Sequence, residues 1–386
     1  MSKLGNLGQL GHRLHRGEIA YDFVGKRRLW YGVSILITIV AIAGLAINGL
    51  KLGIEFSGGA VLTTPKTSYS VTDVQNKIAG HTGDHDATVQ KLGNGGVRIQ
   101  VSDISTEESK NIQKRVATDL GLDSNKIDAQ IVGPSWGEEI SKKAFTGLII
   151  FMILVVIYLA IAFEWRMAIA ALVALIHDLT ITVGVYAIVG FEVTPGTVIG
   201  LLTILGYSLY DTVVVFDGLK ETTRSITKQT RFTYSELANR SLNQTLVRSI
   251  NTTVVALLPV GALLFIGGGI LGAGVLNDIA LALFVGLTAG AYSSIFIATP
   301  LVADFKERDP EIKALKKRVL AKRKADAAKG VDPAEEEQRA REDAVAADED
   351  DEPEDGDRAA AGGVVGQRPQ AAARNRGKNR PSGKRR

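Results

Sequence analysis

The chain has 386 residues and contains no cysteine. Disulfides, iron–sulfur clusters, thiol catalysis and cysteine-ligated zinc sites are therefore excluded. It also lacks any segment of the form G-x-x-x-x-G-K-[ST], the phosphate-binding loop of nucleotide-driven proteins. We therefore expect no cofactor and no covalent chemistry of an enzyme. If the protein performs work, an ion gradient is the energy source that remains.

Histidine is also scarce, and the five histidines are His12, His15, His81, His85 and His177. The spacing of His81 and His85 is the one that helix-borne metal ligands would have. Both lie in the sequence HTGDHD, whose Gly and Asp content is typical of a solvated loop. The sequence therefore predicts no metal site.

Long uncharged apolar runs are abundant, although aromatic residues make up only 6% of the chain. A helix needs about 18 or more mostly apolar residues to cross a bilayer. The first run begins only at residue 30 and is followed by no clear cleavage site, which favours a retained helix over a signal peptide. The sequence thus predicts an α-helical polytopic membrane protein with six transmembrane helices, at 30–47, 144–163, 167–190, 193–216, 250–267 and 279–303.

Basic residues predict the orientation of these helices. Residues 1–29 carry six Lys or Arg against one Glu and one Asp, and the connections at 191–192 and 267–278 carry no Lys or Arg. The linker after the fourth run is basic and contains Lys220, Arg224, Lys228, Arg231 and Arg240. By the positive-inside rule we expect the N-terminal segment 1–29 in the cytoplasm, and six crossings return the C-terminus there. Residues 48–143 then face outward.

The outward segment 48–143 has the pattern of a small α+β domain. Ser105 and Glu108 have capping-box spacing before a helix, and the Gly-Asn-Gly-Gly turn at 93–96 indicates a hairpin. The order β-α-β-β-α-β is that of a ferredoxin-like unit, with strands at 60–66, 87–92, 96–102 and 127–132 and helices at 71–79 and 106–120. It contains no catalytic constellation. We expect it to contact a polypeptide or a partner domain, and a plain spacer is the alternative.

Ionisable groups within the apolar runs are costly to bury, so each is a functional candidate. Asp211 lies in the fourth run. Stepping back from it by three or four residues reaches a small, polar face made of Tyr207, Thr203, Gly200 and Gly196. The Gly-x-x-x-Gly spacing on this face would let another helix approach closely. From its position, Asp211 fits either a proton-carrying carboxyl or a structural ion-pair partner.

Four further polar residues accompany it. Arg248 opens the fifth run, where an ion pair with Asp211 is geometrically allowed, and the alternative is that Arg248 extends to the lipid headgroups. His177 and Asp178, near the middle of the third run, fit a second relay element or a polar pair satisfied between helices. Asp217, at the end of the fourth run, fits a boundary residue in contact with water.

Six sequence blocks resemble the SecD/SecF family, which belongs to the RND-type superfamily of proton-driven transporters. They cover about 30–305 in the family's order: GIEFSGG at 53–59, VGPSWGEE at 132–139, FEWR at 163–166, GYSLYDTVVVFD at 206–217, LNQTLVR at 242–248 and YSSIF at 292–296. The single small outward domain is similar to the SecF branch, because the external region of SecD is much larger. Tyr210 is a departure, since many relatives are expected to have Asn there.

The resemblance implies that the protein lies in the bacterial inner membrane and acts with SecD. It implies use of the proton motive force to complete translocation of unfolded polypeptide through the SecYEG channel. Asp211 and Arg248 are then the proton-coupling residues, with His177, Asp178 and Tyr207 as secondary polar positions. Two alternatives stay open, an RND-type exporter of small molecules or lipids and a structural assembly subunit. An exporter would have a much larger paired external region.

The final segment, 306–386, has few aliphatic residues and alternating blocks of charge. Such blocks with low hydrophobicity predict a disordered cytoplasmic tail. Its first basic stretch, 313–324, is expected at the anionic lipid of the inner leaflet. The last basic block predicts a solvated tail, and contact with ribosomal RNA or lipid is the alternative. No nucleic-acid partner is expected for the folded part.

Overall fold

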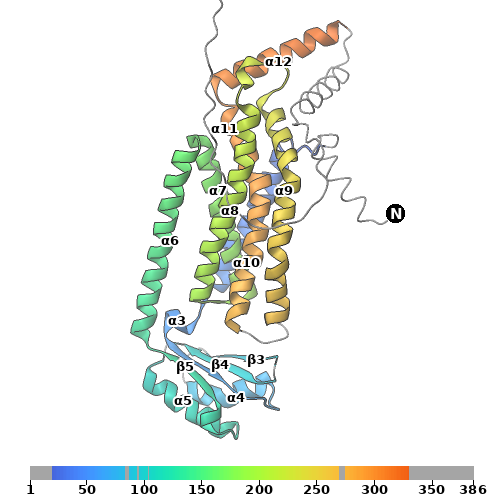
Figure 1. Cartoon of the computed structure of the whole chain (residues 1–386). Coiled ribbons are helices and arrows are strands. Elements are labelled where there is room, and N and C mark those ends of the chain that lie inside the picture. Colours follow the sequence, from blue (N-terminus) through green and yellow to red (C-terminus); the bar gives the residue numbers. More distant parts are fainter. Residues whose placement is uncertain (1–19, 83–86, 94, 103, 269–273, 330–386) are drawn as a thin grey trace, which may run out of the picture. The chain divides into compact units, whose positions relative to one another are not determined.

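A computed structural model of the chain describes residues 20–82, 87–93, 95–102, 104–268 and 274–329 (Figure 1). The described residues up to 324 form one compact unit, and the described residues from 325 onward belong to a second unit. All elements described below belong to the first unit, apart from the last residues of the final helix. The expected stretches 1–19 and 330–386, with His12 and His15, lie outside the described residues, as do residues 83–86 of the HTGDHD sequence.

Within the described residues, six helices are long and apolar enough to cross a membrane, which confirms the number predicted from the apolar runs. Two of them continue through π-helical segments: α9 into η3 (Leu263–Gly268), and α10 into η4 (Ser294–Ala298) and then α11 (Thr299–Lys306). The six helices are α2 (Arg27–Asn48), α6 (Pro134–Ala162), α7 (Trp165–Val189), α8 (Pro195–Thr223), α9 (Tyr234–Ala262) and α10 (Gly274–Ser293).

Three of the helices extend furthest beyond the apolar runs that predicted them. α6 begins at Pro134 instead of 144, α8 ends at Thr223 instead of 216, and α9 begins at Tyr234 instead of 250. Hydropathy reports only the part of a helix that bilayer hydrocarbon can cover, whereas polar turns continue outside it. The polar start of α9 is fixed by a capping box between Thr233 and Glu236.

The segment between the first and second spans contains the predicted βαββαβ unit. Its strands form one antiparallel sheet in the order β3-β4-β2-β5, which is the order of a split β-α-β fold. Ser105 and Glu108 form the predicted capping box. The elements are β2 (Gly59–Thr63), α4 (Val71–Thr82), β3 (Ala87–Lys91), β4 (Val97–Ser102), α5 (Thr106–Asp119) and β5 (Asp128–Val132), with a 3-10 turn η1 (Ser124–Lys126).

The GIEFSGG block forms the junction between the first span and this sheet. β1 (Lys51–Leu52) pairs in parallel with β6 (Glu192–Val193), and α3 (Ile54–Ser57) follows. Gly59 has φ +133, and a Cβ there would lie 2.2 Å from the carbonyl oxygen of Val101, so only glycine fits. Gly137, in the VGPSWGEE block, would likewise meet the carbonyl oxygen of Phe56 at 2.6 Å. The two blocks therefore pack against each other.

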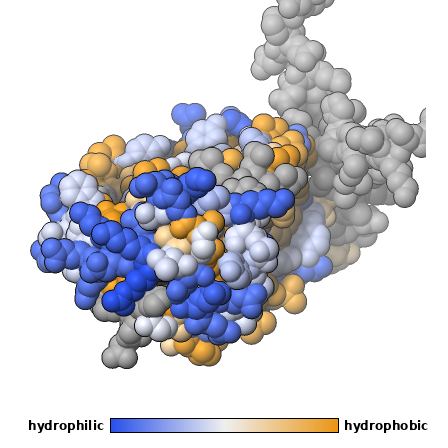
Figure 2. All heavy atoms as spheres, turned by 90° about the horizontal axis from the view of Figure 1, so that it is seen from below, coloured by the Kyte–Doolittle hydropathy of each residue, from blue (hydrophilic) through white to orange (hydrophobic). Residues whose placement is uncertain are grey.

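Large apolar side chains are exposed along α2, α6 and α9, among them Ile153 and Ile161 of α6 and Leu258 of α9. Exposed apolar surface of this extent is typical of helices that contact lipid hydrocarbon. From the end that carries the α+β domain, hydrophilic residues cover much of the surface and hydrophobic ones show mainly towards its edges (Figure 2). The distribution matches a spanning bundle with a water-facing domain.

Glycines set the spacing between α8 and α10. A Cβ at Gly196 would meet Ile279 at 2.8 Å, and one at Gly200 would meet the Cβ of Ala282 at 3.1 Å. The Gly-x-x-x-Gly spacing therefore does admit a neighbouring helix, as predicted. Gly290 of α10 contributes from the other side, because a Cβ there would lie 2.9 Å from the Cβ of Ser208.

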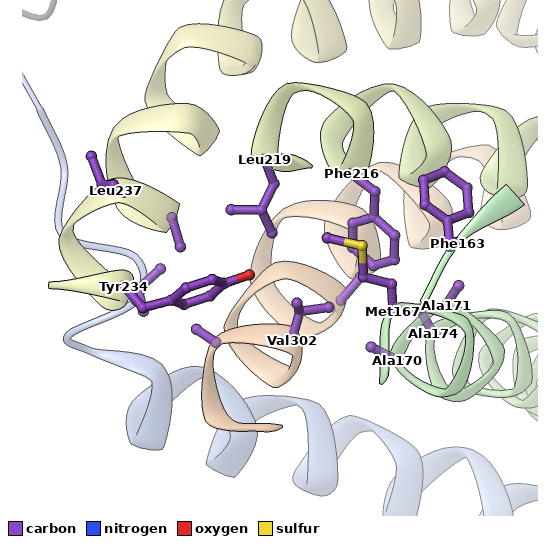
Figure 3. Packing of buried hydrophobic residues seen from close by; sticks show 14 of the residues in the cluster. Phe163, Met167, Ala170, Ala171, Ala174, Phe216, Leu219, Tyr234, Leu237 and Val302 are labelled. Atoms are coloured by element: carbon purple, nitrogen blue, oxygen red, sulfur yellow. The ribbon is translucent and has the colours of Figure 1, made fainter. Parts of the chain in front are cut away.

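The largest apolar cluster lies at the end of the bundle opposite the α+β domain (Figures 1 and 3). Phe163 and Phe216 meet edge to face with ring centroids 5.8 Å apart, a favourable aromatic geometry. Met167 lies beside Phe216 in Figure 3, and Val302 of α11 faces the same interior. The cluster joins the ends of α6, α7, α8, α9 and α11.

The prediction of a disordered tail from residue 306 is wrong for its first part. Residues Pro310–Ala328 form the helix α12, whose Ile312, Leu315 and Val319 are buried in the large apolar cluster. Their i, i+3, i+7 spacing gives one apolar stripe. The many lysines around this stripe lower the mean hydropathy of the segment, so a composition average does not detect it. Arg166 of α7 also forms an ion pair with Asp309, just before α12.

Candidate functional site: two buried carboxylates bound by serines

Asp211 lies on α8 with 5% of its surface exposed. Its carboxylate accepts two hydrogen bonds from hydroxyl groups on other helices. The Oγ of Ser249 on α9 donates to Oδ1 at 2.9 Å, and the Oγ of Ser294, the first residue of η4, donates to Oδ2. Three segments distant in the sequence therefore meet at this carboxylate.

Asp178 is a second buried carboxylate, on α7, with no exposed surface. The Oγ of Ser208 on α8 donates to its Oδ2 at 2.6 Å, and the Oγ of Ser293, the last residue of α10, donates to the same oxygen at 2.8 Å. The Nδ1 of His177 lies 3.3 Å from Oδ1. Asp178 thus has the same kind of environment as Asp211, two serine hydroxyls from two other helical segments.

The two carboxylates share the elements that bind them. Ser208 and Asp211 are three residues apart on α8, and therefore lie on one face of that helix. Ser293 and Ser294 are consecutive, and each donates to a different carboxylate. A movement of α8 or of the α10–η4 junction must therefore affect both sites.

The junction of α10 and η4 is where the helix changes from α to π geometry. π-helical turns are rare and occur frequently at functional sites. In a regular α-helix, consecutive side chains point about 100° apart. The change of geometry occurs where the adjacent residues Ser293 and Ser294 bind two different carboxylates.

In the described part of the chain, neither carboxylate is paired with a Lys or Arg side chain, and the imidazole of His177 lies beside Asp178. Moving a charge from water into a low-dielectric interior is costly unless it is paired. A serine hydroxyl can either donate or accept a hydrogen bond, so each site can hold its carboxyl in the charged or in the protonated form. This is the chemistry of a group that binds and releases a proton.

Arg248 lies on α9 directly before Ser249, and its side chain is exposed. Among the described residues it forms no ion pair with Asp211, and the contact with that carboxylate comes from Ser249 instead. The pairing that the sequence allowed is therefore absent from this arrangement of the helices. Asp217 is exposed in the part of α8 that continues beyond the fourth apolar run, in agreement with a boundary position.

Tyr207 is half-buried and Ser208 beside it is buried. The buried polar face of α8 thus contains Ser208. The face predicted from the sequence contained the neighbouring Tyr207 instead. Tyr210, the departure from the expected family pattern, has 55% of its surface exposed. The substitution at 210 therefore leaves the hydrogen bonds of Asp211 intact.

His177 packs against an aromatic group at the α10–η4 junction. Its ring stacks on Tyr292 with centroids 6.1 Å apart, and its buried Nε2 has no hydrogen-bond partner among the described residues. The hydroxyl group of Tyr292 lies 2.9 Å from the Oγ of Ser34 on α2. The imidazole is thus held in place by packing, beside the carboxylate of Asp178.

A third carboxylate group lies where the α+β domain meets the bundle. Glu192 of β6 is buried and forms an ion pair with Arg98 of β4 at 3.6 Å. Burial raises the pKa of the Glu192 carboxyl above its ordinary value, and the guanidinium of Arg98 opposes part of this rise. Nearby, the hydroxyl of Tyr186 donates to the carbonyl oxygen of Asp278. No group of three or more His, Asp or Glu among the described residues could hold a metal ion.

Four serines at the two carboxylates were missed in the sequence: Ser208, Ser249, Ser293 and Ser294. Three of them lie inside the blocks that carry the family resemblance, GYS and YSSIF, which was the available signal. Serine is frequent in transmembrane helices and often bonds to its own backbone. Its partner follows only once the rotation of each helix is known.

Comparison with known proteins shows which family the chain belongs to. Residues 112–308 match the model of the family described as "Protein export membrane protein SecD/SecF, C-terminal". The protein translocase subunit SecF of Streptomyces coelicolor is 66% identical over 386 residues, covering 100% of both chains. SecF of Mycobacterium tuberculosis H37Rv is 41% identical over 332 residues, covering 83% of this chain and 75% of that one.

A solved structure has the same fold. The crystal structure of SecDF from Thermus thermophilus, described as a translocon-associated membrane protein, is 30% identical with a TM-score of 0.65. The match covers 78% of this chain and 42% of that chain. The family match, the full-length identity and the shared fold agree, and the chain therefore belongs to the SecD/SecF family of protein export membrane proteins, as one of its SecF subunits.

Proposed function

We propose that this subunit couples the proton motive force to protein export, with Asp211 as the residue that binds the proton. The observation that carries the proposal is the environment of Asp211, a buried carboxylate bound by serines of two other helical segments. Ionisable groups inside membrane helices are costly and mark ion pathways. Moving one charge through the membrane field supplies about 2.3 kcal/mol per 100 mV, which can bias a conformational equilibrium.

Arg248 is the cationic partner of Asp211 in another stage of the cycle. It lies one residue before Ser249, so it is about 100° away around the α9 axis. A rotation of α9 by roughly that angle exchanges the serine hydroxyl for the guanidinium beside Asp211. A nearby cation favours the charged carboxylate and so favours release of the proton.

The proposal includes the orientation of the chain in the membrane and its partner proteins. Both termini lie in the cytoplasm and the α+β domain outside, at the inner membrane, as the distribution of Lys and Arg supports. SecD is the partner within the membrane, because the Thermus thermophilus SecDF chain joins a SecF-like part to a longer whole, of which this chain matches 42%. The α+β domain then contacts unfolded polypeptide that leaves the SecYEG channel.

The test is an Asp211→Asn variant of the full chain, purified with SecD and reconstituted with the SecYEG channel in vesicles. We expect assembly with SecD to be retained and export to lose its response to an imposed proton gradient. Asp217→Asn is the matched control, because Asp217 is exposed on the same helix. An Asp211→Asn complex that assembles and still responds fully to the gradient would contradict the proposal and favour a structural subunit.

A further inference from the structure

We infer that Asp178 is a second proton-binding residue, coupled to Asp211 through the hydroxyl groups of Ser293 and Ser294, which act as positioning residues. The inference rests on the proposed function of Asp211 and adds a second carboxyl and a route of communication. It follows from the bonds that each serine makes at the α10–η4 junction.

Each of these two serines has two acceptors within reach. The Oγ of Ser293 lies 2.8 Å from Oδ2 of Asp178 and 3.2 Å from the carbonyl oxygen of Gly290. The Oγ of Ser294 likewise reaches Oδ2 of Asp211 and, at 3.2 Å, the carbonyl oxygen of Ala291. A hydroxyl group has one proton to donate. Each serine therefore has two alternative states, bonded to its carboxylate or to its own helix.

Protonation of a carboxyl selects between these states. When a proton binds to Oδ2 of Asp178, the new carboxyl O–H donates to the Oγ of Ser293. The hydroxyl proton of Ser293 then turns to the carbonyl oxygen of Gly290, and no proton leaves the serine. The same exchange applies to Asp211, Ser294 and Ala291. Each protonation thus adds one hydrogen-bond donor to the backbone of α10 just before the π turn.

The two exchanges are not independent, because the serines are adjacent on one helical turn. Ser208 adds a second link, since it donates to Asp178 while standing three residues before Asp211 on α8. Gly290 keeps α8 and α10 so close that a Cβ there would lie 3.1 Å from the Oγ of Ser208. Interiors packed in this way change between discrete arrangements rather than deforming gradually.

Other titratable groups near the pair are few. His177 lies 3.3 Å from Asp178, and Tyr292 stacks on His177. Arg248, on the α9 side of Asp211, is exposed. If the two carboxylates only stabilised the fold, they would accept hydrogen bonds and neither would bind a proton. A coupled pair titrates in two steps that belong to the pair and not to either residue.

The experiment follows the infrared absorption of protonated carboxyl groups during a pH titration of the full chain in complex with SecD, reconstituted in lipid vesicles. We expect two buried carboxyl signals that the variants assign, one lost in Asp178→Asn and one lost in Asp211→Asn, whereas any signal of the buried carboxyls Glu192 and Asp278 stays the same in both variants. Asp178→Asn should remove one signal and move the titration midpoint of the other by about one pH unit or more. Ser293→Ala should move both midpoints, and Ser293→Thr, which keeps the hydroxyl, should restore them.

Thr288→Ala is the matched control, because Thr288 is an exposed residue of α10 whose hydroxyl donates to the carbonyl oxygen of Phe284. It should leave both midpoints unchanged. If the signal that Asp211→Asn removes keeps its midpoint in both Asp178→Asn and Ser293→Ala, the inference is overturned while Asp211 remains the proton carrier. Failure of the proposed function is a different result, namely that no signal disappears in Asp211→Asn.

Discussion

Asn243 of α9 binds the backbone of Tyr21 through both ends of its side-chain amide. Its Oδ1 accepts from the amide N–H of Tyr21 at 2.9 Å, and its Nδ2 donates to the carbonyl oxygen of Tyr21 at 2.9 Å. Asn239, one turn earlier, accepts from the N–H groups of Phe23 and Val24. The polar start of α9 thus holds the chain just before the first span.

This relationship predicts the effect of Asn243→Ala. Loss of two hydrogen bonds, each worth about 1 kcal/mol, should release the segment around Tyr21 from α9. Because the chain has no cysteine, a single cysteine introduced at position 24, where Val24 has no exposed surface, can be labelled without background once the segment is released. We expect faster labelling in Asn243→Ala, whereas Gln244→Ala, at an exposed neighbouring position, should label at the original rate. Equal rates in both variants would contradict the attachment.

The docking of α12 predicts a large effect at Leu315, which has no exposed surface. Leu315→Ala should cost about 2–4 kcal/mol. Backbone amides of α12 should then exchange with deuterium roughly 30-fold faster or more, since 1.4 kcal/mol is a factor of ten. Leu320→Ala is the control, because 46% of Leu320 is exposed. Unchanged exchange in Leu315→Ala would argue against a packed α12.

Gly290→Ala tests the close approach of α8 and α10. The added Cβ would lie 2.9 Å from the Cβ of Ser208, so the two helices must separate, at a cost of about 1–3 kcal/mol. We expect a lower thermal unfolding midpoint in detergent. Gly206→Ala adds the same atom to α8 where nothing lies within 4 Å, and it should retain the original midpoint. Comparable midpoints for the two variants would show that the contact does not limit stability.

Glu192 predicts a pH dependence at the junction of the α+β domain and the bundle. Burial raises the pKa of its carboxyl above the ordinary value of 4.5. The folded protein therefore binds this proton more tightly than the unfolded chain. The resulting stabilisation is complete below pH 4.5 and is lost as the pH rises through the raised pKa.

The measurement compares thermal unfolding between pH 4 and pH 8, a range of about four units around the expected window. Glu192→Gln should flatten the decline in stability with rising pH, because it removes the titrating group. Glu107→Gln, at an exposed position of α5, should retain the original slope. An unaltered slope in Glu192→Gln would assign the pH dependence to other groups.

The elements that could be predicted from the sequence are those whose signals are local. A run of apolar residues predicted each span, and the capping-box spacing of Ser105 and Glu108 predicted the start of α5. The polar extension of α9 from Tyr234 and the helix around Leu315 were missed. Their apolar residues are spaced along one stripe among many charges, so a segment average hides them.

At the candidate site, sequence reasoning identified the carboxylates and not their partners. Asp178 and Asp211 were evident because charge inside an apolar run is rare and costly. Ser249 and Ser294 could not be assigned, since their bonds depend on the rotation of three helices about their axes. The same rotation decides that Arg248 is exposed here while its neighbour in the chain reaches Asp211.

The π-helical segment η4 has a consequence for the distant end of the bundle. α11 continues directly from it, and Asp304 of α11 forms an ion pair with Arg27 of α2 at 2.9 Å. A π turn holds about one residue more than an α turn. Conversion of η4 to α geometry would therefore turn everything beyond it by about 100° and would pull Asp304 away from Arg27. A change of η4 from π to α geometry would thus rotate α11 about its axis, and no hinge loop is required for this movement.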